Sequence, residues 1–210
     1  MALDLEEQEQ LAELKAWWHQ YGSLVVAAIV AASLTFAGWQ GWRWYERTQA
    51  SRAGALYDTL ARAAQAGDAK ALRDTSGALL ESYPRALYAT MGALTAARFY
   101  FDRNDLKSAK AQLQWVMEHG REEFRDLARL RLAAIALDEK SYDEALKLLD
   151  EKHGAAFDAE YAAAKGDVLV AKNQLADARA AYGVALEKAG NGNAAFRESV
   201  RMRLEALGGS

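Results

Sequence analysis

Residues 24–42 read LVVAAIVAASLTFAGWQGW, and no Asp, Glu, Lys or Arg occurs between Lys15 and Arg43. An α-helix rises about 1.5 Å per residue, so roughly 20 residues cross a hydrocarbon core about 30 Å thick. The length of the stretch and its lack of charge therefore predict one membrane-spanning helix. We place this anchor at residues 22–45, which leaves residues 1–21 as an acidic tail ahead of it.

Aromatic and basic residues stand at both ends of the anchor. Tryptophan and tyrosine prefer the membrane–water interface, and arginine can extend its charged end toward the headgroups. A buried helix of a soluble protein would not be expected to gather its tryptophans at its two ends, and a cleaved signal peptide needs a basic start, whereas this one is acidic. An uncleaved single-pass anchor is favoured, with these interface residues: Trp17, Trp18, Tyr21, Trp39, Trp42, Arg43, Trp44 and Tyr45.

The acidic tail has a helical pattern of its own. Leu11, Leu14, Trp18 and Tyr21 are spaced by three and four positions, which places them on one face of a helix over residues 3–21. We expect this amphipathic helix to lie near the membrane surface. The alternative is a frayed, disordered tail.

Composition limits what the rest of the chain can be. The 210 residues carry a net charge of −3, no cysteine and one proline, Pro84. About 160 residues remain beyond the anchor, enough for one domain with a core. The charge gives no support for nucleic-acid binding, and the lack of cysteine excludes disulfides and cysteine-based metal or redox sites. Strand-forming residues are sparse, so we expect an all-α domain.

A repeat runs through the second half of the chain. Three stretches each pair two small residues twelve positions apart, with a short polar break between them and a large residue four positions after the second. Small residues allow two antiparallel helices to cross closely, and large ones fill the space between neighbouring pairs. The offsets of 36 and 33 residues match the tetratricopeptide period of about 34. The small residues are Ala97 and Ala109, Ala133 and Ala145, and Gly166 and Ala178; the large ones are Leu113, Leu149 and Tyr182.

The predicted fold is therefore all-α: an N-terminal single transmembrane helix followed by a tetratricopeptide-like helical-hairpin solenoid. Residues 85–192 form the repeats, with another kind of helical-hairpin array as the alternative. Residues 46–84 should be connecting helices, broken at Gly67-Asp68, and could be a degenerate fourth unit with Ala71 and Ala78 in the small positions. Residues 193–210 should form a C-terminal capping helix.

Catalytic patterns are missing from the sequence. His19, His119 and His153 are far apart, and none belongs to a convincing metal-ligand set. Residues 190–193 read GNGN and lack the Lys and Ser or Thr of a phosphate-binding loop. We therefore predict no catalytic site, no metal and no cofactor, and no enzyme activity.

The remaining candidate site is a surface. In a tetratricopeptide array the first helix of each pair lines a concave groove, which suits an apolar helix or extended segment of a partner. The third repeat adds Glu160, Asp167 and Val170, so the far end should be acidic. The alternative is that a short array buries these residues as its own core. The groove over the first two repeats carries Met91, Leu94, Arg98, Phe101, Leu127, Leu130 and Leu137.

The acidic tail, the anchor ending in GWQGWRWY at residues 38–45 and the repeats together resemble the YfgM family, over essentially the whole chain. The likeness is strongest at residues 93–97, 130–133 and 142–150. Members of that family are ancillary subunits of the bacterial SecYEG translocon. The resemblance implies an inner-membrane protein with a cytoplasmic N-terminus and a periplasmic repeat domain. It also implies partnership with the chaperone PpiD in handing on secreted proteins, and a link through the tail to a cytoplasmic stress-response regulator.

Charge and resemblance disagree about orientation. Positive residues near a membrane span favour the cytoplasmic side. Arg43, Arg47 and Arg52 follow the anchor whereas Lys15 alone precedes it, so charge would keep the repeats in the cytoplasm. We follow the resemblance and expect the periplasmic arrangement, because the repeat match is long and because long domains cross largely regardless of charge. The predicted function is a translocon scaffold; the alternative is a tetratricopeptide adaptor in another envelope complex.

Overall fold

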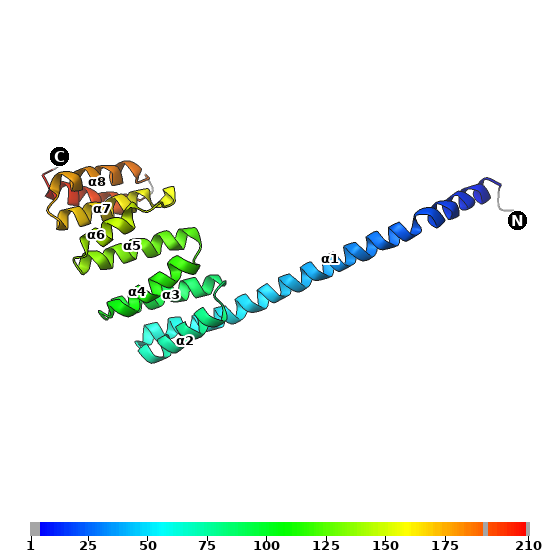
Figure 1. Cartoon of the computed structure of the whole chain (residues 1–210), viewed down its shortest axis with the longest axis horizontal. Helices are drawn as coiled ribbons and strands as arrows, with labels where there is room; N and C mark the ends of the chain where they lie inside the picture. The colour runs from blue at the N-terminus through cyan, green and yellow to red at the C-terminus, as the bar shows by residue number, and fades with distance from the viewer. Residues whose placement is uncertain (1–4, 191–192, 209–210) are drawn as a thin grey trace. The chain divides into compact units, whose positions relative to one another are not determined.

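The computed structural model describes residues 5–190 and 193–208, and no β-strand occurs in that part of the chain. The chain divides into two compact units, with the boundary between Ser51 and Arg52 inside the first helix. The all-α class is confirmed. Figure 1 labels α1 to α8. The elements are α1 (Leu5–Ala66), α2 (Ala69–Ser82), α3 (Leu87–Phe101), α4 (Leu106–His119), α5 (Glu122–Asp138), α6 (Tyr142–Asp150), the short 3₁₀ helix η1 (Ala155–Phe157), α7 (Asp158–Ala171), α8 (Leu175–Lys188) and α9 (Ala194–Ala206).

The first unit contains the anchor as part of a single helix, α1, which also includes the predicted tail helix. Its apolar side chains point away from the helix with no protein around them; Leu34 is 69% exposed and Ile29 is 59% exposed. This segment is long and apolar enough to cross a membrane, in which such exposure is favourable. The hydroxyl of Thr35 donates to the carbonyl of Ala31 (2.8 Å), so it is satisfied within the helix.

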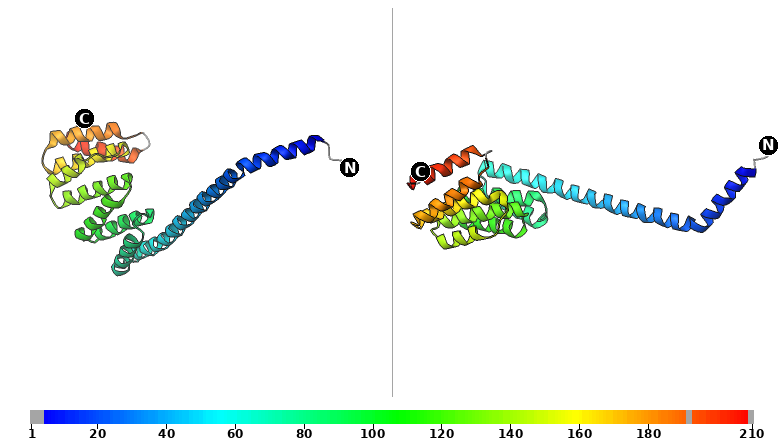
Figure 2. Two further views of the ribbon diagram at one scale, coloured as in Figure 1. Left: turned by 45° about the vertical axis from the view of Figure 1, so that its right-hand side comes forward. Right: turned by 90° about the horizontal axis from the view of Figure 1, so that it is seen from above.

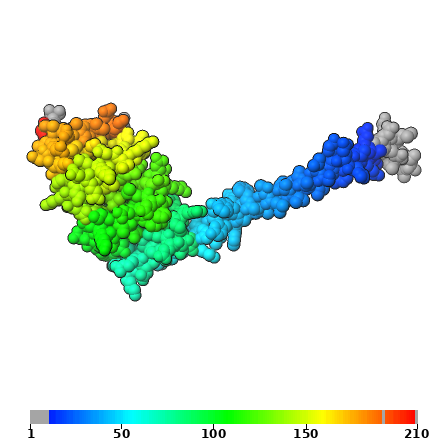
Figure 3. Space-filling model, viewed as in Figure 1, coloured from blue at the N-terminus to red at the C-terminus, as the bar shows by residue number. Residues whose placement is uncertain are grey.

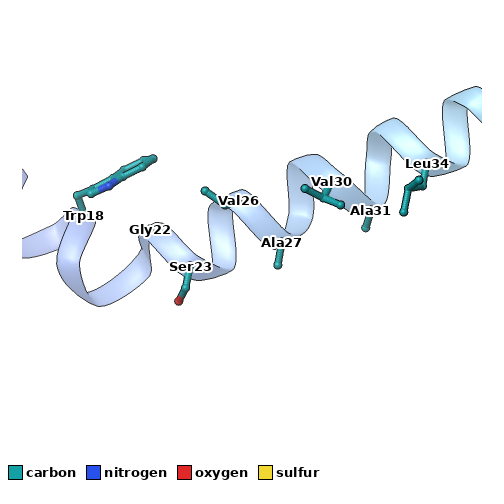
Figure 4. Close-up of a pocket in the computed structure, with 8 residues that line it drawn as sticks. All are labelled: Trp18, Gly22, Ser23, Val26, Ala27, Val30, Ala31 and Leu34. Carbon is teal, nitrogen blue, oxygen red and sulfur yellow. The ribbon is translucent and has the colours of Figure 1, made fainter.

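One face of the anchor is drawn in Figure 4, from Trp18 to Leu34. The Trp18 ring lies so close to Gly22 that a Cβ there would be 3.1 Å from it. This is why Gly22 is buried although the residues around it are exposed. A larger residue at this position would displace an interface tryptophan.

The second unit is a stack of helical hairpins. The C-terminal part of α1 pairs with α2, and α3–α4, α5–α6 and α7–α8 follow in chain order (Figures 1 and 2). From α2 to α9 each helix packs on the next, and the C-terminal part of α1 shares a core cluster with α2. Side chains fill the spaces between the ribbons, as the space-filling view shows (Figure 3). Contacts are thus mainly between neighbours, as expected of a repeat solenoid.

All four hairpins turn through one residue with a positive φ: 75° at Gly67, 59° at Asn104, 61° at Lys140 and 61° at Asn173. The N–H of the following residue donates to the carbonyl five positions earlier, for example Asp105 to Tyr100 at 2.9 Å. This closure satisfies a carbonyl that the helix end would otherwise leave unpaired. The polar breaks of the sequence are therefore short helix-reversing turns with one common geometry.

The crossings within the three later hairpins are close because the paired positions are small. Their alanines are at most 2% exposed, and a Cβ on Gly166 would collide with the Tyr182 ring. The large residues Leu113, Leu149 and Tyr182 are at most 4% exposed. The small-and-large pattern read from the sequence is confirmed here.

The small positions predicted for the first hairpin are wrong. Ala71 is half-buried and Ala78 is exposed. Counting from the turn places Leu60 and Leu72, both fully buried, where the other hairpins have alanine or glycine. Gly92 on α3 supplies the room, since a Cβ there would lie 2.5 Å from Leu79 and 3.4 Å from Leu60. In the first hairpin, the small residue that allows close packing is therefore a glycine on the next helix, α3, and not an alanine of the hairpin itself.

A buried carboxylate holds the connection between α6 and α7. Asp126 on α5 is 3% exposed and accepts hydrogen bonds from Nη1 of Arg129 (3.0 Å) and from the backbone N–H of Gly154 (2.9 Å). The Tyr161 hydroxyl donates to the Asp126 carbonyl (3.0 Å), and Arg129 also donates to the carbonyl of Lys152 (3.1 Å). This cluster attaches the loop and the start of the third repeat to the second.

Candidate binding groove

The residues predicted to line the groove differ in how accessible they are. Leu94 is 8% exposed, and Met91, Leu127, Leu130 and Leu137 are half-buried. The three half-buried leucines, all on α5, pack against core clusters: Leu127 against the one built mostly by α3 and α4, and Leu130 and Leu137 against the one that α5, α6 and α7 share. Much of the predicted apolar lining is therefore core, in line with the alternative reading, while two predicted residues remain open: Arg98 is exposed and Phe101 is 37% exposed.

A cleft lies between α3 and α5 around those two residues. Its volume is about 170 Å³, and Ala97, Leu113 and Ile135, each at most 2% exposed, form its floor. A second, shallower hollow of about 440 Å³ runs beside α3 to the C-terminal part of α1. The two hollows share Arg98 and Arg131. The walls of the cleft are Arg98, Phe101, Arg131 and Ala134.

The cleft is basic. Nε of Arg98 donates to both carboxylate oxygens of Asp102 (2.7 and 2.8 Å), a pair that is well exposed and so worth little. Arg103 stacks over the Phe99 ring at 3.6 Å. Three arginines, at positions 98, 103 and 131, therefore face one aspartate across the two hollows.

Arg131 stands on the wall of the cleft, is exposed as a whole residue, and lines the second hollow together with Asp102. Among the residues that the structure describes, it forms no ion pair. Burial of its guanidinium lowers the pKa of Arg131 first, and the nearby charge of Arg98 lowers it further. Both effects disfavour the charged form that arginine nevertheless retains.

Sequence reasoning named Arg98 and Phe101 but missed Arg131 and Ala134. Counting by the repeat offset, Arg131 occupies the position of Thr95, which the small-and-large pattern does not mark. One signal was available: Arg131 stands between Leu130 and Leu132, two positions after Arg129, at the start of a run that is apolar up to Leu137. A positively charged residue among apolar positions of a helix indicates either a solvent-exposed position or a binding site.

The far end of the groove is closed by the chain itself. Asp167 accepts hydrogen bonds from Nη1 of Arg203 on α9 (2.8 Å) and from the Tyr182 hydroxyl (2.7 Å). Burial, and then this bond to Asp167, raises the pKa of the Tyr182 hydroxyl. Val170 packs in the cluster that α8 and α9 share. Of the two acids expected at this end, Asp167 is therefore neutralised by α9, and Glu160 is half-buried.

The three histidines lie apart from the cleft. His19 is exposed, His119 stacks on Trp115 (4.6 Å between ring centres), and His153 lies 3.9 Å from the Tyr161 ring. In residues 11–190 and 193–208, no three or more His, Cys, Asp or Glu side chains are grouped to hold a metal ion. The arrangement offers binding through shape and charge.

The aromatic residues at the ends of the anchor are open to their surroundings. The seven predicted interface tryptophans and tyrosines are between 42% and 69% exposed. Neighbouring rings contact one another, such as Trp17 with Tyr21 at 5.8 Å, and the Arg43 guanidinium lies 4.7 Å from the Trp39 ring centre. Exposed aromatic rings beside an arginine fit the chemistry of a headgroup layer.

Comparisons with known proteins extend over the whole chain. The family model described as tetratricopeptide repeat-like domain matches residues 15–209. A Neisseria gonorrhoeae protein is 32% identical over 99% of this chain and all of its own length. Relatives in Haemophilus influenzae (26% identical, 99% of this chain and all of theirs) and Escherichia coli (24%, 96% of both) are similar as well.

All three relatives carry the name ancillary SecYEG translocon subunit. No solved structure matches the chain. The family match includes the anchor as well as the repeats, so it is not limited to a common repeat motif. The chain belongs to the tetratricopeptide repeat-like domain family, and within it to the group of bacterial proteins named ancillary SecYEG translocon subunit.

Proposed function

We propose that this chain is a membrane-anchored interaction scaffold of the SecYEG translocon. The observation that carries the proposal is the likeness, from end to end, to relatives with that name. The molecule has the two parts that such a scaffold needs. An anchor with exposed apolar side chains can contact membrane proteins, and a basic cleft in the repeat domain can hold a soluble partner.

In its finer form, the proposal places the tail in the cytoplasm and the repeat domain in the periplasm. There the repeats work with the chaperone PpiD to hand on secreted proteins, and the tail contacts a cytoplasmic stress-response regulator. The resemblance to the YfgM family supports these assignments. The cleft between α3 and α5 is the surface we assign to the periplasmic partner.

The test is co-purification of the tagged full chain from solubilised membranes, with SecY and PpiD quantified. Replacing residues 22–45 with an unrelated transmembrane helix should abolish recovery of SecY. Phe101→Glu should lower recovery of PpiD, because a charge replaces the exposed aromatic wall of the cleft. Val184→Glu, at a position 45% exposed on α8, is the matched control and should change neither.

Recovery of a different envelope complex in place of SecY, such as one for outer-membrane assembly or division, would replace the proposal with the adaptor function. Leu130→Glu is the less useful variant. Leu130 is half-buried and packs against a core cluster. Reduced partner recovery by this variant could therefore come from unfolding of the domain and would not identify the binding surface.

Orientation has its own test. Protease added to spheroplasts with an intact inner membrane should digest the repeat domain and leave a tag placed before Leu11 protected. The opposite pattern would follow the arginines after the anchor and place the repeats in the cytoplasm. A periplasmic role with PpiD would then be impossible.

A further inference from the structure

We propose that the cleft between α3 and α5 binds an internal segment of a partner protein in which an Asp or Glu side chain lies beside an apolar side chain. The inference deepens the proposed function only in naming the partner's chemistry. It requires a protein partner but not a particular translocon.

The site combines an apolar hollow with a pair of arginines. Arg98 and Arg131 stand where the two hollows meet, with an apolar floor on one side and the groove toward α1 on the other. The floor is made by Ala97, Leu113 and Ile135, and Phe101 is exposed above it. An apolar side chain fits the first hollow while its neighbour reaches the arginines.

The two arginines differ in how far their charge is neutralised. Arg98 is partly neutralised by Asp102, whereas Arg131 is exposed to the like charge of Arg98 and forms no ion pair among the described residues. A carboxylate placed between the two arginines would relieve the repulsion and accept the planar, two-pronged hydrogen bonds that guanidinium favours. Two neighbouring arginines on the wall of an apolar cleft are thus complementary to an acid beside an apolar side chain.

The shape of the two hollows favours a side-chain carboxylate over the carboxylate at a chain end. The hollows extend in both directions from the arginine pair. A terminal carboxylate bound there would leave one hollow empty, whereas a continuous segment uses both. We therefore assign the carboxylate to an internal acidic residue.

The experiment uses the full chain in detergent micelles and fluorescent helical peptides of about 15 residues, acetylated and amidated. The peptides share a leucine-rich face and differ only in a central Glu, Gln or Lys. The Glu peptide should bind about tenfold more tightly than the Gln peptide. Arg131→Gln should remove that preference, and Arg131→Glu should transfer it to the Lys peptide.

Arg85→Gln is the matched control, because Arg85 is exposed and outside both hollows, and it should leave the preference unchanged. Arg98→Gln provides a second cleft variant, and thermal melting checks that each variant folds. Equal binding of the Glu and Gln peptides, no binding of any peptide, or a preference that survives Arg131→Gln would overturn the inference. Tighter binding of a Gln peptide with a free C-terminal carboxylate would also overturn it, in favour of a chain end.

The two proposals fail separately. If SecY is not recovered with the wild-type chain, the translocon function fails while a peptide preference would stand. If SecY is recovered and the peptides show no preference, only the carboxylate inference fails.

Discussion

The inner faces of the first and third repeats carry opposite charges at one shared position. The repeat offsets bring Arg98 of α3 and Asp167 of α7 to the same place in their hairpins. Around Arg98 the cleft is open and Arg131 forms no ion pair in the described part of the chain, whereas Asp167 accepts hydrogen bonds from Arg203 and Tyr182. In the third repeat the chain itself neutralises the charge at this position, whereas in the first repeat the position borders a cleft that is open to a partner.

The largest effect is expected at the junction that joins these two regions. Asp126→Ala removes the buried carboxylate between α5 and the α6–α7 loop and leaves Arg129 without its charge partner. Breaking a buried ion pair costs about 3–5 kcal/mol, and Arg129 is only 14% exposed. Chemical denaturation of residues 50–210 should report a loss of that order.

Asp138→Ala is the control for this variant, since Asp138 is an exposed acid on the same helix. An equal loss from both changes would mean that the Asp126 cluster does not hold the repeats together.

The next effect tests whether all the repeats share one close crossing. Ala133 is 1% exposed where α5 and α6 cross, so Ala133→Trp must force the pair apart, at about 1–3 kcal/mol or more. The fragment 50–210 should be soluble, helical and cooperatively folded, and the variant should melt at a lower temperature. Ala134→Trp is the matched control because the adjacent Ala134 is exposed. A random-coil spectrum for the fragment, or equal melting of the two variants, would contradict this.

A smaller effect is expected where the third repeat is closed. Arg203→Gln removes the cation on Asp167, but both side chains are more than a third exposed, so the loss should be at most about 1 kcal/mol. The Arg203 charge also lowers the pKa of Tyr182, so its removal should raise that pKa further in a spectroscopic titration.

Arg201→Gln is the control for the Arg203 change, because Arg201 pairs only with the exposed Glu198. A Tyr182 titration that responds equally to both changes would show that the third repeat is not closed through Arg203.

The smallest effect on stability is expected at the N-terminal ends of the second helices of the repeats, where the side-chain capping differs. Asp105 caps α4 by accepting from the N–H of Ser108 (3.0 Å), whereas Gln174 makes no such bond at the start of α8. Hydrogen bonds from Ser108, side chain first and backbone next, lower the pKa of Asp105 below 3.8. Because the folded pKa is depressed, the stabilisation is present above the unfolded pKa and is lost as pH falls through the folded value.

Carboxyl chemical shifts followed by NMR through acid pH should give an Asp105 pKa below 3.8. Asp105→Asn should then show a weaker acid dependence of unfolding than the wild type. A carboxyl that titrates at or above its ordinary value would contradict the cap.

The sequence predicted the fold well because its signals are local. The anchor follows from a stretch of uncharged residues, and the hairpins follow from alanines twelve positions apart with a polar break between them. The first hairpin was misassigned since its close approach depends on Gly92 from the next helix. Packing between hairpins is set by residues that no single repeat contains.

The site was predicted only in part for the same reason. Arg98 and Phe101 were found from their register, but Arg131 joins them only because α5 lies across the cleft from α3. Leu94 was expected to be open and is 8% exposed, because the array packs this side chain into its core. The Asp126 cluster was also missed, since its partners are a loop N–H and a tyrosine about 30 residues or more away.

The division of the core into four clusters has a dynamic consequence. When each hairpin is held mainly by its neighbours, local opening need not wait for the whole domain to unfold. Helix α9 buries only Val200, so its amide hydrogens should exchange with solvent first, with protection increasing toward α3 and α4. A segment bound between α3 and α5 would then slow hydrogen exchange there and leave the exchange of α9 almost unchanged. Binding at the cleft should therefore have little effect on the stability of the other end of the stack.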